Sequence, residues 1–369
     1  MTRNGRIRTV LVTGASGFVG SHVVKALLDE GYNVVGTARP GPKAEHMKKA
    51  CLTYGSERFR VVEVNDIFKD TLPADTWKGV DALIHVATPL TGPGLGKTPI
   101  EEVVNSSIDG TLNIVKQAYQ AGVRTIIVTG SISAVVPNDE EEVREYYGNE
   151  VWNPITKEEA LSKNDFVSIY VASKKLAEQA IWEWADSVVK DDNINHVDVD
   201  VTILHPPLIF GPYQPAAEFF LVTPETHSTN RHLYELINPS GNYPFLALWI
   251  DVRDVAKAHV RALGNGTNST GGLKGGDRKR IIIGAPYDFD FKEAVKILEE
   301  KRPELKTQGR IISKEVPVVK VKHLGCDMKR VEEVLGMKEK EFITVEKMLL
   351  DTIDDYLAYE RKWIKQGSI

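Results

Sequence analysis

Tyr170 and Lys174 are the two side chains whose types and spacing most clearly suggest chemistry. On a helix, a spacing of four residues places both on one face. A lysine ammonium close to a phenol favours the phenolate, so Lys174 is expected to lower the pKa of Tyr170. Such a pair can protonate a carbonyl oxygen while a hydride reaches the carbonyl carbon. Many helices contain this pair, so its meaning depends on the rest of the chain.

Ser131 adds a third group, just after an apolar run at residues 125–129 that is typical of a buried strand. Ligands bind at the carboxyl ends of parallel strands, so the Ser131 hydroxyl can donate to a substrate carbonyl while Tyr170 supplies the proton. No Gly-x-Ser-x-Gly motif surrounds Ser131, which argues against acyl transfer. Together the three residues predict a hydride-transfer site.

A glycine-rich turn precedes these residues in the chain. It follows an apolar run at residues 9–13 and leads into a segment of helical period at 18–30. Glycines let the backbone approach a pyrophosphate, and the helix start presents free N–H groups to it. The residues predicted to bind a dinucleotide here are Gly14, Ser16, Gly17, Phe18, Val19 and Gly20.

The residues after the second and third apolar runs predict which dinucleotide is bound. NAD-specific folds carry an acidic residue after the second strand, whereas this chain has Arg39. An arginine there pairs with a 2′-phosphate, with help from Lys43, so NADPH is expected in preference to NADH. The alternative is an exposed arginine without a ligand. Asp66 can accept a hydrogen bond from the adenine amino group, but taken alone it fits a turn or capping role better.

Apolar runs and helical segments alternate through the first half of the chain. This alternation predicts an α/β fold with a doubly wound parallel sheet of the Rossmann type. Strands are predicted at residues 9–13, 32–37, 59–64, 82–86, 125–129 and 197–204, and helices at 18–30, at 100–121 and from the Tyr170 segment to about residue 187.

The second half has a different composition. Residues 205–249 are rich in proline and aromatic residues without a clear period, which is typical of a lid or pocket wall, although packed loops have the same composition. The aromatic residues between Tyr213 and Trp249 are therefore expected to line an apolar pocket. Residues 139–165 are expected to be an acidic loop with a solvated run at 139–142, and residues 264–279 an exposed loop.

A small C-terminal lobe is expected from a strand at 280–283 and helices near 290–301, 327–335 and 344–365. The predicted domains are an NADP-binding Rossmann domain at residues 1–204, whose sheet is completed by parts of 250–285, and a substrate-binding lobe and lid that take up most of 205–369.

Composition narrows the partners. The chain of 369 residues is 42% hydrophobic and 26% charged, which fits a soluble protein with a sizeable core. A formal net charge of −5 argues against nucleic acid or an anionic membrane as the main partner. Cys51 and Cys326 are far apart in sequence and outside any metal-ligand spacing, so a zinc site or a disulfide framework is not expected. A cytoplasmic location is the default expectation.

Taken together, the motifs resemble those of an extended short-chain dehydrogenase/reductase, in the dihydroflavonol reductase-like branch that includes fungal NADPH-dependent aldehyde, ketone and methylglyoxal reductases. The motif His85-Val-Ala-Thr-Pro89 and the box Asp251-Val-Arg-Asp-Val-Ala256 are its most discriminating parts. The other matching segments are residues 12–20, 35–39, 110–113, 129–131, 170–174 and 206–212.

The resemblance implies roles for individual residues. It implies that Ser131, Tyr170 and Lys174 are the catalytic residues and that Arg39 binds the 2′-phosphate of NADPH. The residues that it places against the cofactor are Ala87 and Thr88, beside the cofactor ribose, and Pro206, Leu208 and Ile209, against the nicotinamide amide.

The chain also departs from the family pattern. Gly130 stands where relatives often have a second serine, and Ser107 stands where many dehydrogenases of the wider superfamily carry an asparagine. Ser133 is a possible alternative donor to Ser131. His205 is expected near the nicotinamide, although a packing role is the commoner one for such a histidine.

The expected function is NADPH-dependent reduction of a small-molecule aldehyde or ketone by a monomer or homodimer. One alternative is an NAD-dependent sugar-nucleotide epimerase or dehydratase, which shares the serine, tyrosine and lysine but usually has an acidic residue where this chain has Arg39. The other alternative is a non-catalytic NADPH-binding sensor, which usually lacks the tyrosine or the lysine.

Overall fold

The computed structural model describes residues 8–88, 100–137, 150–189, 199–224, 226–243, 248–264, 278–316 and 325–367. Its centre is a seven-stranded sheet in which every neighbouring pair is parallel. In sheet order the strands are β3 (Phe59–Glu63), β2 (Asn33–Ala38), β1 (Thr9–Thr13), β4 (Ala82–His85), β5 (Thr125–Thr129), β6 (Asp200–His205) and β9 (Lys279–Ile282). The predicted doubly wound fold is confirmed.

Strand β1 shows why the apolar runs form buried strands. Successive side chains point to opposite faces of a sheet, and both faces of β1 are covered. Val10 and Val12 pack into the core on one face, while Leu11 packs into the core on the other, opposite Val35 of β2 and Leu83 of β4. The chain order of the strands reverses between β1 and β4, so the carboxyl ends of these two strands flank the crevice where such folds bind ligands.

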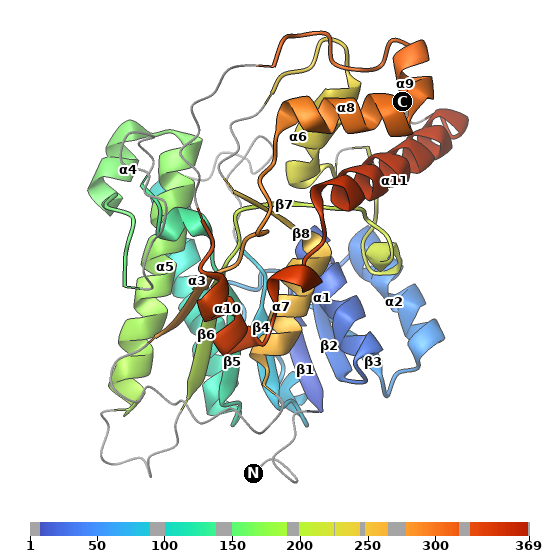
Figure 1. Cartoon of the computed structure of the whole chain (residues 1–369). Helices are drawn as coiled ribbons and strands as arrows, with labels where there is room; N and C mark the ends of the chain where they lie inside the picture. The colour runs from blue at the N-terminus through green and yellow to red at the C-terminus, as the bar shows by residue number, and fades with distance from the viewer. Residues whose placement is uncertain are drawn as a thin grey trace.

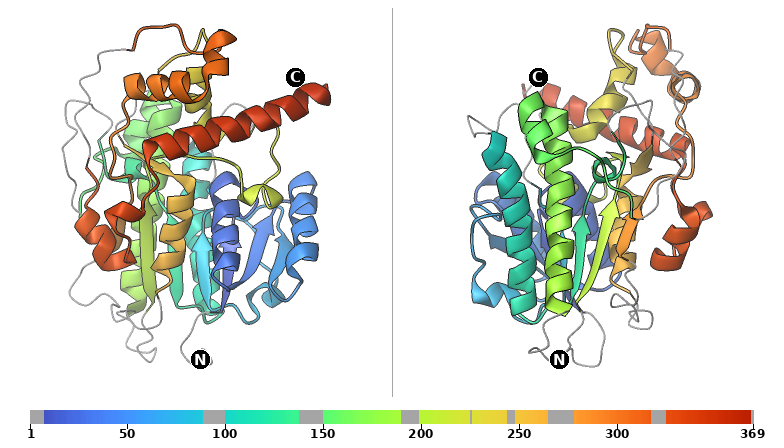
Figure 2. Two further views of the ribbon diagram at one scale, coloured as in Figure 1. Left: turned by 45° about the vertical axis from the view of Figure 1, so that its right-hand side comes forward. Right: turned by 90° about the vertical axis from the view of Figure 1, so that its left-hand side faces the viewer.

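Helices cover both faces of the sheet (Figure 2). One face is covered by α3 (Ile100–Gln120) and α5 (Phe166–Val189), which lie side by side. The other is covered by α1 (Phe18–Asp29), α2 (Pro42–Tyr54), α7 (Val252–Ala262) and α10 (Met328–Leu335). The prediction that α10 belongs to the C-terminal lobe is wrong, because its Val331 and Leu335 pack into the core between the sheet and α7.

A second lobe lies above the carboxyl ends of the strands (Figure 1). It has its own apolar core. Its elements are the parallel pair β7 (Leu208–Phe210) and β8 (Trp249–Asp251) and the helices α6 (Arg231–Tyr234), α8 (Phe291–Lys301), α9 (Pro303–Thr307) and α11 (Val345–Lys365). The crevice of the sheet therefore faces this lobe.

Two further predictions need correction. Part of the segment expected to be a loop forms α4 (Lys157–Lys163), whose start is capped by Thr156 through a hydrogen bond from the Glu159 N–H. The prediction of an aromatic pocket wall is wrong for Tyr213, Phe219, Phe220 and Trp249, which are at most 5% exposed and pack in the core. Sequence composition could not separate a pocket wall from a packed interface between lobes. The predicted acidic run at 139–142 and most of the glycine-rich loop lie outside the described residues.

Within the described ranges, no helix is long and apolar enough to span a bilayer. In the same part of the chain, no group of three or more histidine, cysteine, aspartate or glutamate side chains could hold a metal ion.

Candidate active site

The turn between β1 and α1 is built around close backbone contacts that only glycine permits. Gly14 has a φ of +66°, and a Cβ there would lie 2.9 Å from the Ala87 nitrogen. A Cβ on Gly20 would lie 2.1 Å from the Gly14 carbonyl oxygen. The Gly17 N–H donates to this same oxygen over 3.0 Å. The glycine spacing thus brings the start of α1 tightly against the ends of β1 and β4.

The start of α1 is suited to an anion. Its N-cap, Gly17, contributes no side-chain cap, and the first turn holds no acidic residue. The predicted residues Ser16 and Val19 lie in this turn and in the first turn of the helix. The Phe18 side chain packs instead against Tyr213, with ring centroids 5.9 Å apart, so only the main chain of Phe18 can bind a ligand. Free N–H groups at a helix start favour a phosphate.

Two cations lie at the end of β2. Arg39 and Lys43 are both exposed, and Lys43 is in the first turn of α2, after Gly41 with its φ of +109°. Neither cation pairs with a carboxylate among the described residues. Asp66 has a turn role, because its Oδ1 accepts a hydrogen bond of 3.0 Å from the Phe68 N–H. The structure therefore supplies free positive charge where a 2′-phosphate was expected, and it gives Asp66 a structural role.

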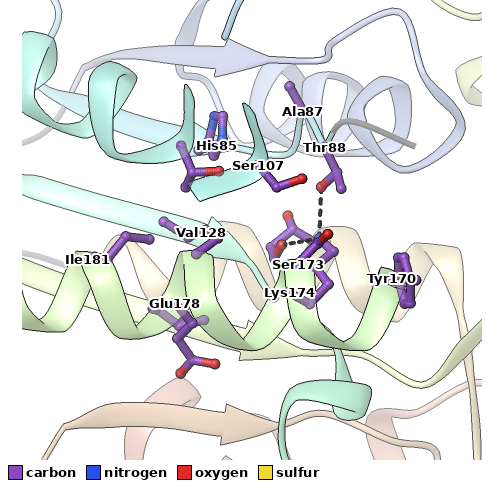
Figure 3. A pocket seen from close by; sticks show the side chains of 15 residues that line it. His85, Ala87, Thr88, Ser107, Val128, Tyr170, Ser173, Lys174, Glu178 and Ile181 are labelled. Atoms are coloured by element: carbon purple, nitrogen blue, oxygen red, sulfur yellow. Dashed lines mark hydrogen bonds between the residues drawn. The ribbon is translucent and has the colours of Figure 1, made fainter. Parts of the chain in front are cut away.

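Lys174 joins three elements. From α5 its Nζ donates to the Thr88 hydroxyl over 2.7 Å and to the Thr129 carbonyl over 3.1 Å (Figure 3). Thr88 follows β4 and Thr129 ends β5, so the ammonium ties the catalytic helix to the ends of both strands. Burial lowers the pKa of Lys174 to about 8, and the negative charge of Glu178 opposes this effect.

Tyr170 lies one helical turn before Lys174 and contacts Ser131. Burial raises the pKa of the Tyr170 phenol, and a hydrogen bond with the Ser131 side chain acts in the opposite direction. In the protein chain by itself burial dominates, and the Lys174 ammonium donates to Thr88 and Thr129. The lowering of this pKa by Lys174 together with the oxidised nicotinamide stays a prediction. At neutral pH Tyr170 carries its proton, as a general acid must.

Ser131 and Ser133 form one unit. The Ser133 hydroxyl donates to Ser131 Oγ over 2.8 Å, and the Ser133 N–H approaches the same atom at 3.3 Å. Because Ser131 Oγ accepts these contacts, its own proton is free to be donated forward. The two serines are therefore a hydrogen-bonded pair in which Ser133 donates to Ser131.

A cavity of about 30 Å³ lies next to Lys174, between α3, α5 and the sheet. His85, Ser107 and Glu178 are among the residues that line it (Figure 3). Ser107 uses its hydroxyl on the Val103 carbonyl, at 2.9 Å, in its own helix. The pKa of His85 is lowered to about 3, first by burial and then by the charge of Lys174, so this imidazole is neutral.

Sequence reasoning missed two of these residues. His85 shares a hydrogen bond of 2.7 Å with Thr13 Oγ1, and the Ala87 N–H donates to the same threonine over 3.3 Å. Glu178 stands four residues after Lys174, so the helical period that paired Tyr170 with Lys174 could have found it.

The segment after β6 closes the site from the other side. The Ile132 N–H, next to Ser131, donates to the Pro206 carbonyl over 3.1 Å. Leu208 and Ile209 continue into β7 and are partly exposed. One edge of the sheet thus brings together the glycine turn, the strand ends, Ser131, Tyr170 and Lys174.

Comparison with known proteins gives this arrangement its family. Residues 10–273 match the NAD dependent epimerase/dehydratase family. The chain belongs to this family. The NADPH-dependent methylglyoxal reductase of Saccharomyces cerevisiae is 30% identical over 95% of this chain and 99% of its own. A cinnamoyl-CoA reductase of Medicago truncatula is 28% identical over 90% of this chain and 96% of its own.

A solved relative has the same fold over nearly the whole chain. The crystal structure of yeast methylglyoxal/isovaleraldehyde reductase, complexed with NADPH, superposes with a TM-score of 0.76 and 27% identity over 95% of this chain and 99% of that one. The resemblance to the reductase branch of the extended short-chain dehydrogenases is confirmed, as is the expectation of an oxidoreductase.

Proposed function

We propose that this chain is an NADPH-dependent carbonyl reductase that converts aldehydes or ketones to alcohols. The observation that carries the proposal is the meeting of Ser131, Tyr170 and Lys174 with the glycine turn at one edge of the sheet. The yeast methylglyoxal reductase, which is named as NADPH-dependent and was solved in complex with NADPH, supports the same activity.

The residues present fit NADPH. The glycine contacts of Gly14 and Gly20 leave the backbone open to a pyrophosphate, and the start of α1 favours its charge. Arg39 and Lys43 offer cations, free of described partners, to a 2′-phosphate. Thr88 and Lys174 would hold the nicotinamide ribose, with Pro206, Leu208 and Ile209 beside the nicotinamide amide. When bound, NADPH supplies the hydride.

The protein groups supply binding and the proton. Ser131 donates a hydrogen bond to the substrate carbonyl oxygen, keeps its proton, and so polarises the carbonyl. Tyr170, neutral because its pKa is raised, delivers its own proton to this oxygen as the alcohol forms. Lys174 stabilises the phenolate that remains on Tyr170 by its positive charge. Each residue thereby acts at the atom where charge develops.

The sugar-nucleotide epimerase alternative has one observation in its favour, the family match itself, because that family takes its description from epimerases and dehydratases. Arg39 argues against it, since an acidic residue at the end of β2 would bind the ribose hydroxyls of NAD. The non-catalytic sensor alternative is disfavoured because Ser131, Tyr170 and Lys174 are all present, with Tyr170 in contact with Ser131.

The experiment is to mix the purified protein with NADPH or NADH and a panel of aldehydes, 1,2-dicarbonyls and aryl ketones, and to follow oxidation of the nicotinamide. The proposal expects consumption of NADPH with a strong preference over NADH. Absence of consumption with every carbonyl, together with NAD bound to the purified protein, supports the epimerase alternative instead.

A further inference from the structure

His205 occupies space that the absence of a side chain at position 130 leaves open. A Cβ on Gly130 would lie 2.9 Å from His205 Nδ1 and 3.0 Å from a methyl carbon of Ile203. Real Cβ atoms do not approach a ring nitrogen so closely, and the imidazole cannot swing away because it is fully buried. Because Gly130 has no side chain, the His205 ring can pack beside Ser131.

The imidazole connects directly to the Ser131 main chain. His205 Nδ1 lies 3.1 Å from the Ser131 carbonyl oxygen, which can only accept, so Nδ1–H donates. This contact adds to the bond from Gly130 N–H to the Leu204 carbonyl, at 2.8 Å, and fixes the peptide that follows Ser131. The orientation of this peptide sets where the Ser131 hydroxyl points.

A buried carboxylate lies on the other side of the ring. His205 Nε2 is 3.3 Å from Glu178 Oε1, a contact that is attractive when Nε2 carries a proton in addition to the one on Nδ1. The same oxygen accepts from Arg280 Nε over 2.6 Å and from Trp182 Nε1 over 3.1 Å. Glu178 and Arg280 are 3% and 2% exposed. Burying charge is costly, so the carboxylate is fixed in place by its partners.

Arg280, which pairs with Glu178, contacts two further residues. Its guanidinium lies over the Trp152 ring, 3.7 Å from the centroid, and donates to the Val151 carbonyl over 2.8 Å. A continuous series of contacts therefore runs from Arg280 on β9 through Glu178 on α5 and His205 on β6 to Ser131 after β5.

Glu178 also lies one helical turn after Lys174 and lines the same cavity (Figure 3). The Glu178 carboxylate points away from the Lys174 ammonium (Figure 3), so its negative charge acts on the ammonium without a direct contact. Its attraction favours the charged form of Lys174 against the effect of burial. One buried carboxylate consequently acts on two catalytic residues.

We propose that His205 and Glu178 are positioning residues for the reduction: His205 orients Ser131 in the space left by Gly130, and Glu178 holds both His205 and the charged form of Lys174. This inference rests on the proposed reductase function. Neither residue touches the reacting atoms, so both act through Ser131 and Lys174. A small displacement of such groups lowers kcat more than it weakens the binding of substrate or cofactor.

The first test replaces His205 while keeping its bulk. His205→Phe removes the bond to Ser131, and His205→Asn retains a side-chain amide where Nδ1 stood. We expect kcat to fall about tenfold in the phenylalanine variant, equivalent to about 1.4 kcal/mol of transition-state stabilisation, with the KM for NADPH unchanged. The asparagine variant should recover part of the loss. Equal kcat in both variants and the wild type overturns the role of His205.

The second test uses the Gly130 contact. Gly130→Ala should lower kcat because its Cβ displaces the imidazole. In the double variant Gly130→Ala/His205→Asn the smaller side chain accommodates this Cβ, so the loss should be no greater than that of His205→Asn alone. Contacting residues couple in this way. If the losses of kcat in the two single variants add up fully in the double variant, the contact between Gly130 and His205 does not set kcat. This conclusion holds even if each variant is less stable than the wild type.

The third test addresses Glu178 through the pH profile. Glu178→Gln keeps the shape of the side chain but removes its charge, so Lys174 should lose its proton at lower pH. We expect the fall of kcat on the basic side to begin about one pH unit lower than in the wild type. The control is Glu183→Gln, an exposed residue on the same helix, which should leave the profile unchanged. An unshifted profile in Glu178→Gln overturns the role of this carboxylate.

The outcomes separate this inference from the proposed function. A wild-type protein that reduces no carbonyl refutes the function itself. A wild-type protein that reduces carbonyls, with variants that keep its kcat and pH profile, refutes only the positioning roles. Thermal unfolding of each variant with NADPH bound identifies loss of folding as a separate effect.

Discussion

Lys174 and Thr88 join the catalytic helix to the end of β4 by a hydrogen bond of 2.7 Å from the ammonium to the hydroxyl. Thr88 follows Ala87, whose backbone lies against Gly14 of the glycine turn. Thr88 and Ala87 thus connect the helix of Tyr170 and Lys174 to the glycine turn, which we propose as the cofactor-binding side of the site. Changes at Thr88 should affect both.

Replacing Thr88 tests this link. Thr88→Val keeps the shape of the side chain but removes the acceptor for Lys174, so the ammonium loses one of its two hydrogen bonds to Thr88 and Thr129. We expect kcat/KM to fall about tenfold and the affinity for NADPH to weaken. Thr88→Ser is the matched control, because it retains the hydroxyl and should stay close to the wild type. Equal losses in both variants contradict a role for this hydrogen bond.

Arg39 and Lys43 should determine the choice of dinucleotide. Arg39→Ala removes a cation from the expected 2′-phosphate site, so the Kd for NADPH should rise at least about tenfold while that for NADH changes little. Lys43→Ala should have a smaller effect of the same kind. Lys49→Ala, on the exposed side of α2, serves as the control. Parallel weakening of NADPH and NADH in Arg39→Ala removes the argument for a 2′-phosphate contact.

Phe166 should influence the choice of substrate. It lies one turn before Tyr170 on α5, with the two rings nearly parallel, 14° apart in plane and 6.3 Å apart between centroids. The phenylalanine is 53% exposed, at the end of α5 nearer the C-terminal lobe (Figure 1). An exposed aromatic ring beside the proton donor is an apolar surface for the substituent of a carbonyl substrate.

Phe166→Ala should therefore raise the KM for aryl and branched aliphatic carbonyls about tenfold and leave the KM for a small dicarbonyl such as methylglyoxal nearly unchanged. Val167→Ala is a matched control, since Val167 is 55% exposed but points about 100° away around the helix. If both variants treat the two substrate classes alike, Phe166 does not contact the substrate.

Most of the central sheet could be predicted from the sequence. Runs such as 9–13 and 125–129 have three buried apolar residues at their centre, and both match the strands observed. Helix α2 was missed because charged residues outnumber its three buried ones, Ala44, Met47 and Ala50, so its apolar period is weak. The burial of Tyr213 and Phe219 depends on contacts between lobes, which no local pattern encodes.

For the site, residue types and order selected Ser131, Tyr170 and Lys174 as candidates, but they did not predict the electrostatics of these side chains. The raised pKa of Tyr170 comes from burial, which the sequence does not reveal, and the bond between Lys174 and Thr88 joins residues 86 positions apart. The relation between Gly130 and His205 likewise requires the pairing of β5 with β6. Tertiary contacts, rather than motifs, set these properties.

Asp254 should make stability depend on pH. This carboxylate is 3% exposed and accepts from the Ile343 N–H over 2.9 Å. Burial raises its pKa from 3.8 to about 7; the charge of Asp251 adds to this, while the Ile343 bond and the charges of Lys257 and Arg253 oppose it. Between these two pKa values the folded state binds more protons than the unfolded state, so this residue lowers stability as pH rises.

Asp254→Asn keeps an oxygen for the Ile343 N–H and removes the titration. We expect the Tm of the variant, relative to the wild type, to increase as the pH is raised from about 4 to about 7 and to level off above that. Calorimetry at a series of pH values measures this difference. A Tm difference that is constant with pH shows that Asp254 ionises normally in the folded protein.

The most direct measurement is the rate of NADPH oxidation by an aldehyde in the wild type and in Tyr170→Phe, with NADPH affinity measured on the same samples. The account predicts that the variant binds NADPH as the wild type does but transfers hydride at least about a hundredfold more slowly, because the carbonyl oxygen has lost its proton donor. A Tyr170→Phe variant that reduces the aldehyde at the wild-type rate contradicts the account.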